Sequence, residues 1–317
     1  MILPDFLVEN KYGYYCQYGD FYIDPKYPVK KAVISHAHGD HAVPGHSEIY
    51  STEATVLFMQ ARYARKMQGT AAFIKTYKER FQIGEVEITF LPAGHILGSA
   101  QILMQYKGVK YLYTGDYKLT PDVTCEAIES VKAEVLITET TFANPAVSHP
   151  DPREEIQKIR EQKAKILLGC YSLGKAQSIT ALINHYCPEI EVYIHRNMEA
   201  LHRIYQKQGR ADLKYRPYRR REFKEGSRNK VYLVPPMTFQ NYYRATDIIR
   251  AFASGWDRLQ EKNGITLYIS DHADWEQIVQ YIREVKPEEI WTVHGNGKPL
   301  HDYFHTTLQV RGLDKIG

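Results

Sequence analysis

Ser35-His36-Ala37-His38-Gly39-Asp40-His41 is the stretch of sequence from which the fold is best predicted. His36 and His38 are two residues apart, so an extended chain points both side chains the same way. Gly39 allows the backbone to turn sharply, which returns Asp40 and His41 to the same point. Imidazole nitrogens combined with a carboxylate suit zinc or a similar divalent ion. A polar loop with incidental histidines is the alternative, and distant partner residues argue against it.

The chain repeats one pattern, in which a predicted strand ends at a polar residue. The first case is the apolar run 32–34, which precedes the histidine stretch. The other predicted strands, 86–91, 110–114, 135–138 and 290–293, lead to His95, Asp116, Glu139 and His294. A sheet holds side chains at its strand ends rigidly, which suits a metal site.

These strand-end residues are numerous enough to bind two divalent metal ions. The predicted ligands are His36, His38 and His95 for one ion, Asp40, His41 and His294 for the other, and Asp116 as a bridge. Zinc is the preferred ion for histidine-rich ligation, and manganese is the alternative. Water bridging two such ions becomes a hydroxide nucleophile near neutral pH, and the ions also stabilise a reacting phosphate.

Composition and charge leave several classes of partner open. The 317-residue chain carries a net charge of +4, which permits an anionic partner without requiring one. Its four cysteines form no C-x-x-C pair and are predicted to be free thiols of a reducing cytosol. The N-terminus lacks the pattern of a signal peptide, and no apolar run has membrane-spanning length. We therefore expect a cytoplasmic protein without a membrane partner.

A change of composition at 144–152, rich in Pro, Ser and Asn, predicts a second unit. Alternating strand and helix patterns beyond it predict a small parallel sheet. We expect 242–252 to be helical and a strand at 265–269 to begin the return to the first unit. The predicted domains are 1–145 with 263–317, and 146–262 as an insertion.

Together, in this order, the motifs resemble the metallo-β-lactamase fold. The stretch from Ser35 to His41 matches its His-x-His-x-Asp-His signature, and His95, Asp116 and His294 match its remaining ligand positions. The segment after Glu139 resembles the β-CASP nucleic-acid-processing branch. This resemblance implies an α/β protein, an αββα sandwich with a short inserted β-CASP-like α/β cap domain.

Two phrases resemble DNA-directed members of that branch. Residues 171–175, Tyr-Ser-Leu-Gly-Lys, look like the start of the cap in Artemis-type DNA nucleases. Residues 113–118 and 120–122 look like bacterial DNA ligase-associated exonucleases, which implies repair beside a ligase and a helicase. Two features depart from this pattern. Artemis-type enzymes usually lack the last histidine, whereas His294 is present here as in RNA-processing members, and the cap is short.

The resemblance also implies roles for individual residues. Asp40, Glu139 and His272 are the predicted catalytic residues, with His272 protonating the leaving oxygen and Glu139 accepting a hydrogen bond. The alternative for His272 is a histidine at a helix start, bonded to Asp271 or Asp274. The alternative for Glu139 is an ordinary strand-end carboxylate. Asp24 is predicted to orient the histidine stretch, although a turn residue there is common.

Nucleic-acid contacts are predicted in two places. Ser172, Gly174 and Lys175 precede a helix, where backbone N–H groups and a lysine suit a phosphate; a simple helix cap is the alternative. Within the basic run 214–230, the predicted contacts are Arg219, Arg220 and Arg221, interleaved with aromatic residues that could stack on bases. Such charge clusters are often only solvated surface.

The sequence thus predicts a metal-dependent phosphodiesterase that acts on DNA, as an exonuclease in DNA repair, through hydroxide attack on phosphorus. An RNA-processing nuclease of the same branch is the nearest alternative, and His294 favours it. A small-molecule metallo-hydrolase and a non-catalytic nucleic-acid-binding subunit are further alternatives. The cap, Glu139 and His272 argue against the former, and the complete ligand set against the latter.

Overall fold

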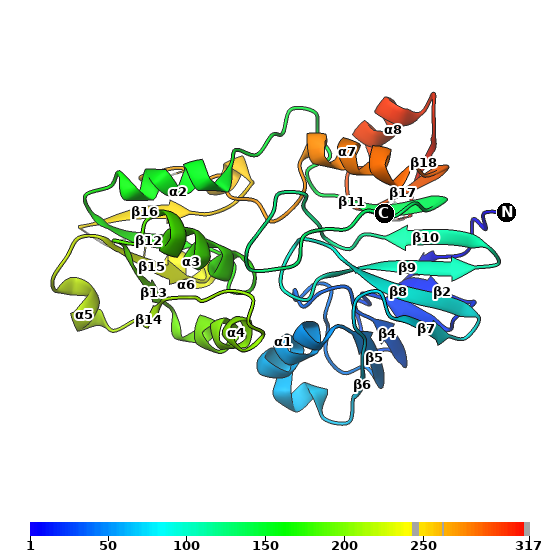
Figure 1. Cartoon of the computed structure of the whole chain (residues 1–317), viewed down its shortest axis with the longest axis horizontal. Helices are drawn as coiled ribbons and strands as arrows, with labels where there is room; N and C mark the ends of the chain where they lie inside the picture. The colour runs from blue at the N-terminus through cyan, green and yellow to red at the C-terminus, as the bar shows by residue number, and fades with distance from the viewer. Residues whose placement is uncertain (243–246, 262, 314–317) are drawn as a thin grey trace. The chain divides into compact units, whose positions relative to one another are not determined.

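The computed structural model describes residues 1–242, 247–261 and 263–313, which form two compact units (Figure 1). Unit 1 comprises the described residues of Met1–Pro121, Cys125–Ser148 and His272–Gly317. Unit 2 comprises the described residues of Asp122–Thr124 and His149–Asp271. The chain therefore leaves unit 1, builds unit 2 and returns, so unit 2 is an insertion.

Unit 1 contains two sheets. The six-stranded sheet runs in chain order through β1 (Val8–Asn10), β2 (Gly13–Cys16), β3 (Phe21–Ile23), β4 (Lys31–Val33), β5 (Glu48–Ser51) and β6 (Ala71–Ile74). The seven-stranded sheet has the order β18 (Gln309–Gly312), β17 (Glu289–Gly295), β11 (Val135–Thr140), β10 (Val109–Tyr113), β9 (Ala100–Tyr106), β8 (Val86–Pro92) and β7 (Arg80–Ile83). Strands β7 to β10 pair antiparallel, whereas β10, β11, β17 and β18 pair parallel.

Buried side chains join unit 1 into four layers. A core that includes Phe21, Phe90 and Trp291 fills the space between the two sheets. A second core packs the seven-stranded sheet against α7 (Trp275–Val285) and α8 (Lys298–Phe304), and a third packs the six-stranded sheet against α1 (Glu53–Tyr63), which η1 (Ala64–Met67) follows. This arrangement is the predicted αββα sandwich, and the prediction is confirmed.

The elements follow from local sequence. Strand β8 alternates buried and half-buried residues before its fully buried end, as a strand packed on a core should. Helix α7 begins where the Asp274 side chain accepts a hydrogen bond from the Gln277 N–H, and it ends at the left-handed residue Lys286.

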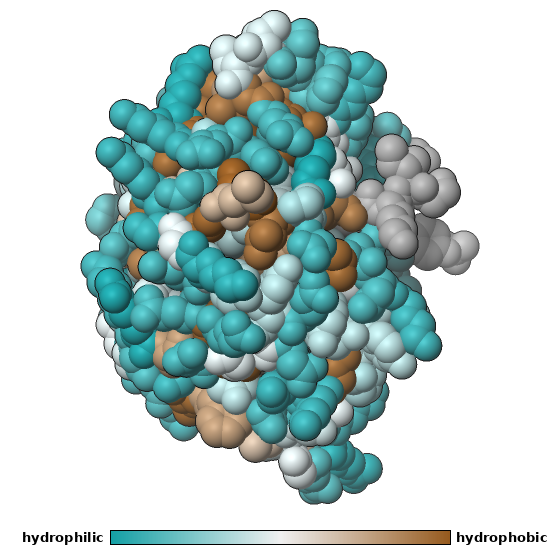
Figure 2. Space-filling model, turned by 90° about the vertical axis from the view of Figure 1, so that its right-hand side faces the viewer, coloured by the Kyte–Doolittle hydropathy of each residue, from teal (hydrophilic) through white to brown (hydrophobic). Residues whose placement is uncertain are grey.

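The face shown in Figure 2 is mostly hydrophilic, with small separate hydrophobic patches. Among the described residues, no helix has the length and apolar character that a membrane span requires.

Unit 2 is a separate α/β layer structure. Its five strands pair in parallel, in the order β14 (Arg216–Pro217), β13 (Glu191–Ile194), β15 (Lys230–Val234), β12 (Lys165–Gly169) and β16 (Ile248–Phe252). One sheet face packs on α2 (Pro152–Arg160), α3 (Lys175–Tyr186) and α4 (Arg196–Lys207). The other packs on α5 (Arg220–Lys224) and α6 (Pro236–Asn241), and η2 (Asp257–Leu259) follows β16. The expected parallel sheet is therefore present.

Two local predictions differ from the structure. The predicted helix 242–252 is wrong over 248–252, because this segment forms β16 beside β12; residues 243–246 lie outside the described residues. Its β-branched Ile248 and Ile249 favour a strand. Residues 265–269 form no named strand; Leu267 makes one bridge to Ala253, and both belong to the core of unit 2. The observed return to unit 1 is therefore at His272, beyond the predicted residue 263. All four cysteines are free, as predicted, and the structure shows that all four are also buried.

Candidate metal centre

The predicted ligands gather at one end of the strands of unit 1. They follow or end β4, β8, β10, β11 and β17, which carry respectively His36 and His38, His95, Asp116, Glu139, and His294. A turn returns His41 toward His38, because the N–H groups of His41 and Ala42 both donate to the His38 carbonyl. The backbone of Gly39 lies outside the left-handed region.

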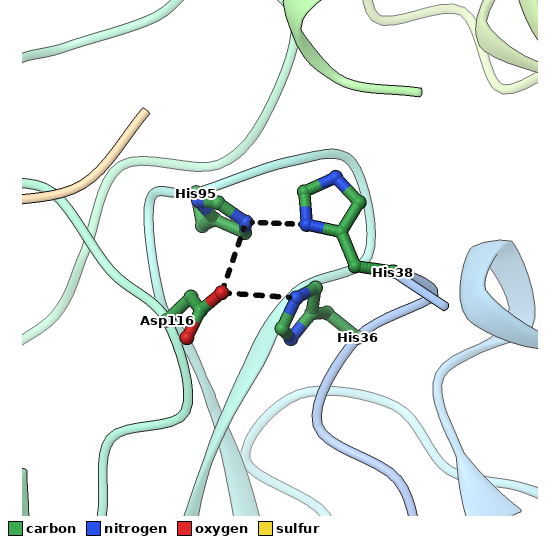
Figure 3. Close-up of side chains that lie close together, drawn as sticks. All are labelled: His36, His38, His95 and Asp116. Atoms are coloured by element: carbon green, nitrogen blue, oxygen red, sulfur yellow. Dashed lines mark hydrogen bonds and ion pairs between the residues drawn. The ribbon is translucent and has the colours of Figure 1, made fainter. Parts of the chain in front are cut away.

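Four of these side chains form a compact cluster, which Figure 3 shows: His36, His38, His95 and Asp116. Their potential ligand atoms all lie within 4.8 Å of one another. Nε2 of His95 is 3.0 Å from Nδ1 of His38, and Oδ2 of Asp116 is 3.4 Å from Nε2 of His36. Both sheets contribute to this cluster, so their packing assembles it.

The hydrogen bonds of His36 leave one nitrogen available to a metal. Because the Ser35 hydroxyl donates to Asp24, its oxygen can accept from Nδ1 of His36, 3.0 Å away. Nε2 is then the unprotonated nitrogen. It is buried, and it lacks a hydrogen-bond partner among the described residues. A buried acceptor that faces a carboxylate suits a bound cation. The donor set therefore fits a divalent ion.

Electrostatics within the cluster favour the same conclusion. Burial lowers the pKa of His95 well below its usual value, and the nearby His38 and His36 lower it further. Burial raises the pKa of Asp116, but the neighbouring histidines, His41 first, outweigh this effect and bring it well below its usual value. Neutral imidazole and ionised carboxylate are the forms that bind a metal.

The second predicted ligand set is less closely assembled. Nε2 of His41 lies 3.4 Å from Oδ1 of Asp116 and 3.9 Å from Oδ2 of Asp40. The Asp40 side chain is 81% exposed, so it lies at the margin of the site. The His294 ring centroid is 5.0 Å from that of His41, and its Nε2 is 3.3 Å from the Tyr113 hydroxyl. The structure thus brings His41 and Asp116 together, with Asp40 and His294 at the edge.

Asp24 is a buried carboxylate beneath the histidine stretch. Its Oδ1 accepts from the Ser35 N–H at 2.7 Å, and its Oδ2 accepts from the Tyr113 hydroxyl at 3.1 Å. Nδ1 of His41 lies 2.8 Å from Oδ2, which directs Nε2 of His41 toward Asp116. Burial lowers the pKa of His41, but the Asp116, Asp24 and Asp40 carboxylates raise it to about 10. The surrounding carboxylates therefore outweigh the effect of burial on His41.

His272 and Glu139 form a hydrogen-bonded pair. Nδ1 of His272 is 2.9 Å from Oε2 of Glu139, while its Nε2 is 4.0 Å from Oδ2 of Asp116. Glu139 also accepts from the Tyr117 N–H at 2.9 Å and the Thr141 hydroxyl at 2.6 Å. With Glu139 fixed in this way, the remaining nitrogen of His272 is directed toward the carboxylate of the cluster.

Three features of the site were missed by sequence reasoning. The Ser35 and Tyr113 hydroxyls bond to Asp24, yet neither is a metal-ligand residue type at a strand end, so no motif marks them. The pairing of β11 with β17 shifts register between Glu139 and Thr140, so His294 is the extra residue of a β-bulge. Its φ of 52° is left-handed, and a bulge that depends on pairing with β11 leaves no local signal.

The predicted phosphate-binding loop is internally bonded. The Lys175 side chain is 3% exposed and forms an ion pair with Asp271 at 3.0 Å. Gln177 accepts from the Gly174 N–H and donates to the Ser172 carbonyl. This geometry opposes the prediction that Lys175 binds phosphate, because its ammonium is turned into unit 2.

The basic run presents its arginines to solvent, buries Phe223 and leaves Tyr215 and Tyr218 half-buried. The side chains of Arg219, Arg220 and Arg221 are exposed; Arg219 pairs with Glu222 and Arg221 with Glu225. The aromatic residues of the run instead pack inward: Phe223 is buried, and Tyr218 stacks on Tyr232 with ring centroids 3.8 Å apart. The arginines remain accessible to an anion, whereas Phe223 is withdrawn from solvent and Tyr218 is half-buried.

Comparison with known proteins adds a family match and partial relatives. Residues 265–303 match the RMMBL family model, described as Zn-dependent metallo-hydrolase RNA specificity domain. The chain is 30% identical over 327 residues to a protein of Opitutus terrae named Probable DNA ligase, covering 97% of this chain and 30% of that protein. It is 30% identical over 190 residues to the RNase J-like protein of Methanocaldococcus jannaschii, covering 50% of this chain and 44% of that protein. The chain thus spans less than half the length of both relatives.

A solved structure shares the fold. The crystal structure of a protein of unknown function from Enterococcus faecalis V583 aligns with a TM-score of 0.63 at 14% identity. The alignment covers 90% of this chain and 80% of that one. At this identity the likeness concerns the fold alone.

Proposed function

Because the chain belongs to the β-CASP branch of the metallo-β-lactamase fold, we propose that it is a metal-dependent phosphodiesterase that hydrolyses nucleic acid. One observation carries the proposal: buried Nε2 of His36 lacks a hydrogen-bond partner among the described residues and faces the Asp116 carboxylate within a four-ligand cluster. The match to a zinc-dependent metallo-hydrolase family supports the same chemistry.

We propose two divalent ions, with zinc preferred and manganese as the alternative. The proposed ligands are His36, His38 and His95 for one ion, Asp40, His41 and His294 for the other, and Asp116 shared between them. Bound ions would supply a hydroxide from water near neutral pH and stabilise charge on the phosphate. The chain's own part is to hold these ligands, with Asp24 orienting Ser35 and His41 beneath them.

His272 is the proposed proton donor to the leaving oxygen. The Glu139 carboxylate holds its Nδ1, which keeps a proton there and leaves Nε2 directed toward Asp116. When Nε2 carries a proton as well, it can transfer that proton to the departing alkoxide. In this proposal Asp40 is a metal ligand and catalytic residue at the exposed rim of the site, and Glu139 positions His272.

The proposed substrate is DNA, attacked from an end as in repair. Support comes from the similarity of almost the whole chain to a protein named Probable DNA ligase. RNA is the second candidate, supported by the RNase J-like relative and by a family description that mentions RNA specificity. The exposed Arg219, Arg220 and Arg221, with Ser172 and Gly174, are the proposed contacts to nucleic acid. Association with a ligase and a helicase in the cytoplasm belongs to the same proposal.

The test is a nuclease assay on single-stranded DNA and RNA of matched length and sequence. Each substrate is labelled separately at its 5′ or 3′ end, and zinc and manganese are tried separately. We expect progressive shortening of DNA, loss of cleavage in Asp116→Ala, and a rate lowered about 100-fold or more in His272→Ala. His301→Ala, an exposed histidine on α8, is the matched control and should behave as wild type.

The outcomes separate the candidates. Cleavage of RNA alone would assign the chain to the RNA-processing members. Absence of cleavage by wild type with bound metal, on both substrates, would refute the proposed function.

A further inference from the structure

Unit 2 buries an ion pair at the point where the chain leaves it. Nζ of Lys175, the first residue of α3, is 3.0 Å from Oδ1 of Asp271, and the two side chains are 3% and 6% exposed. The same ammonium donates a hydrogen bond to the Ile269 carbonyl. Two apolar side chains of similar volume would often be as stable or more stable here, since burying each charge costs several kcal/mol in desolvation. Stability alone therefore does not explain why this ion pair is present.

The residue after Asp271 is His272, and the peptide bond between them joins the two units. Beyond it, Glu139 binds the His272 ring, and the Ala273 N–H donates to the Tyr117 carbonyl at 2.7 Å. The chain is therefore anchored on both sides of the crossing, from α3 before it and from unit 1 after it. Because Asp271 and His272 are consecutive, no residue lies between the side chain that Lys175 binds and the backbone of His272.

We propose that Lys175 is a positioning residue for His272. By binding the side chain of Asp271 and the carbonyl of Ile269, it fixes the backbone from which the His272 side chain projects. The inference rests on the proposed role of His272 as proton donor. It gives Lys175 a function that needs a buried ammonium, whereas phosphate binding needs an exposed one.

A displaced proton donor has a recognisable kinetic signature. An oligonucleotide releases a strongly basic alkoxide, which needs a proton as it leaves. Bis(p-nitrophenyl) phosphate releases a weakly basic aryl oxide, which does not. Loss of positioning at His272 should therefore slow oligonucleotide cleavage selectively, and an error of about 1 Å can cost about 100-fold.

The experiment measures kcat and KM on both substrates with the metal-loaded, full-length chain. We expect Lys175→Met to lower kcat on the oligonucleotide about 10- to 100-fold, with KM and aryl ester hydrolysis within about threefold of wild type. His272→Ala should show the same selectivity. The matched control is Lys230→Met, a buried lysine of unit 2 that binds the Glu222 and Glu225 carbonyls and should slow both substrates equally or neither.

A double variant separates positioning from stability. Lys175→Met alone leaves the Asp271 carboxylate buried without its partner, so it is compared with Lys175→Met/Asp271→Asn, in which neither charge remains. We expect the double variant to recover Tm while its kcat on the oligonucleotide stays low, and it carries the test if Lys175→Met does not fold. Recovery of kcat together with Tm would overturn the inference, as would equal slowing of both substrates.

Failure of the proposed function would look different. If wild type cleaves neither substrate, or if His272→Ala slows both equally, the proton-donor role is lost and the inference falls with it. If His272→Ala is selective and Lys175→Met is not, only the inference is overturned.

Discussion

Replacement of Asp24 by asparagine tests the support beneath the metal centre. The Asp24 Oδ2 atom accepts hydrogen bonds from the Ser35 and Tyr113 hydroxyls and from His41 Nδ1. Oδ1 accepts from the Ser35 N–H. An asparagine can keep its oxygen on only one side, so its NH₂ group must face at least one N–H or O–H donor.

The expected effect follows from these contacts. Hydrogen bonds to a charged group each contribute about 1.5–3 kcal/mol, and loss of a partner that orients a metal ligand lowers metal affinity about 10- to 100-fold. We therefore expect Asp24→Asn to weaken zinc binding by about 10- to 100-fold, or about 1.4–2.7 kcal/mol. His41 would lose its carboxylate partner at Nδ1, so its Nε2 would no longer be held toward Asp116.

A competition titration with a chromophoric zinc chelator measures this affinity at fixed pH. Asp20→Asn is the matched control, because Asp20 also has a left-handed backbone but carries an exposed side chain that pairs with Lys31. An affinity of Asp24→Asn within threefold of wild type, equal to that of Asp20→Asn, would refute the argument.

Three further predictions concern other parts of the chain. Gly115→Ala should destabilise the fold by about 1–3 kcal/mol in denaturant unfolding, because φ is 56° and the new Cβ would lie 2.9 Å from Ser35 Cβ. Gly108→Ala, with φ of 81° but open space around its Cβ, should cost less. Burial lowers the pKa of His202 to about 4, so the free energy of unfolding should fall by up to about 3 kcal/mol as the pH drops from about 6.5 to about 4. Denaturant unfolding curves recorded across that pH range should show a smaller fall for His202→Gln. Removing metal with a chelator should lower Tm, by an amount that grows with the free zinc concentration used for loading, and a Tm unchanged by chelation would contradict the metal site.

The gathering of His36, His38, His95 and Asp116 was predictable because its signal is local. The spacing from His36 to His41 and the single polar residues after β8 and β10 place four ligands at one end of a sandwich, whichever loops connect them. The layers were predictable for a similar reason, because each strand and helix pattern of unit 1 has one apolar side to bury.

What failed depended on contacts between distant residues. The bulge at His294 exists only because β17 pairs with β11, and Lys175 is buried where Ile269, 94 residues further along, and Asp271 bind its ammonium. The segment 265–269 has strand-like composition, yet only Leu267 finds a strand-like partner, so composition alone misplaced the return to unit 1. Burial of Phe223 likewise depends on packing in unit 2 that the basic run does not reveal.

The hydrogen bond between Glu139 and His272 joins residues 133 positions apart, and almost the whole insertion lies between them. If Lys175 positions His272 as proposed, partial unfolding of the insertion in mild denaturant would remove the anchor at Asp271 and leave His272 held only from unit 1, while the cluster formed by residues 36 to 116 stays closed within unit 1. Hydrolysis and metal retention would then have separate denaturation midpoints, with hydrolysis lost first. If the chain binds metal and hydrolyses nucleic acid as proposed, it would pass through a state that keeps its metal but has lost activity, so metal content alone would overestimate the active fraction of a preparation.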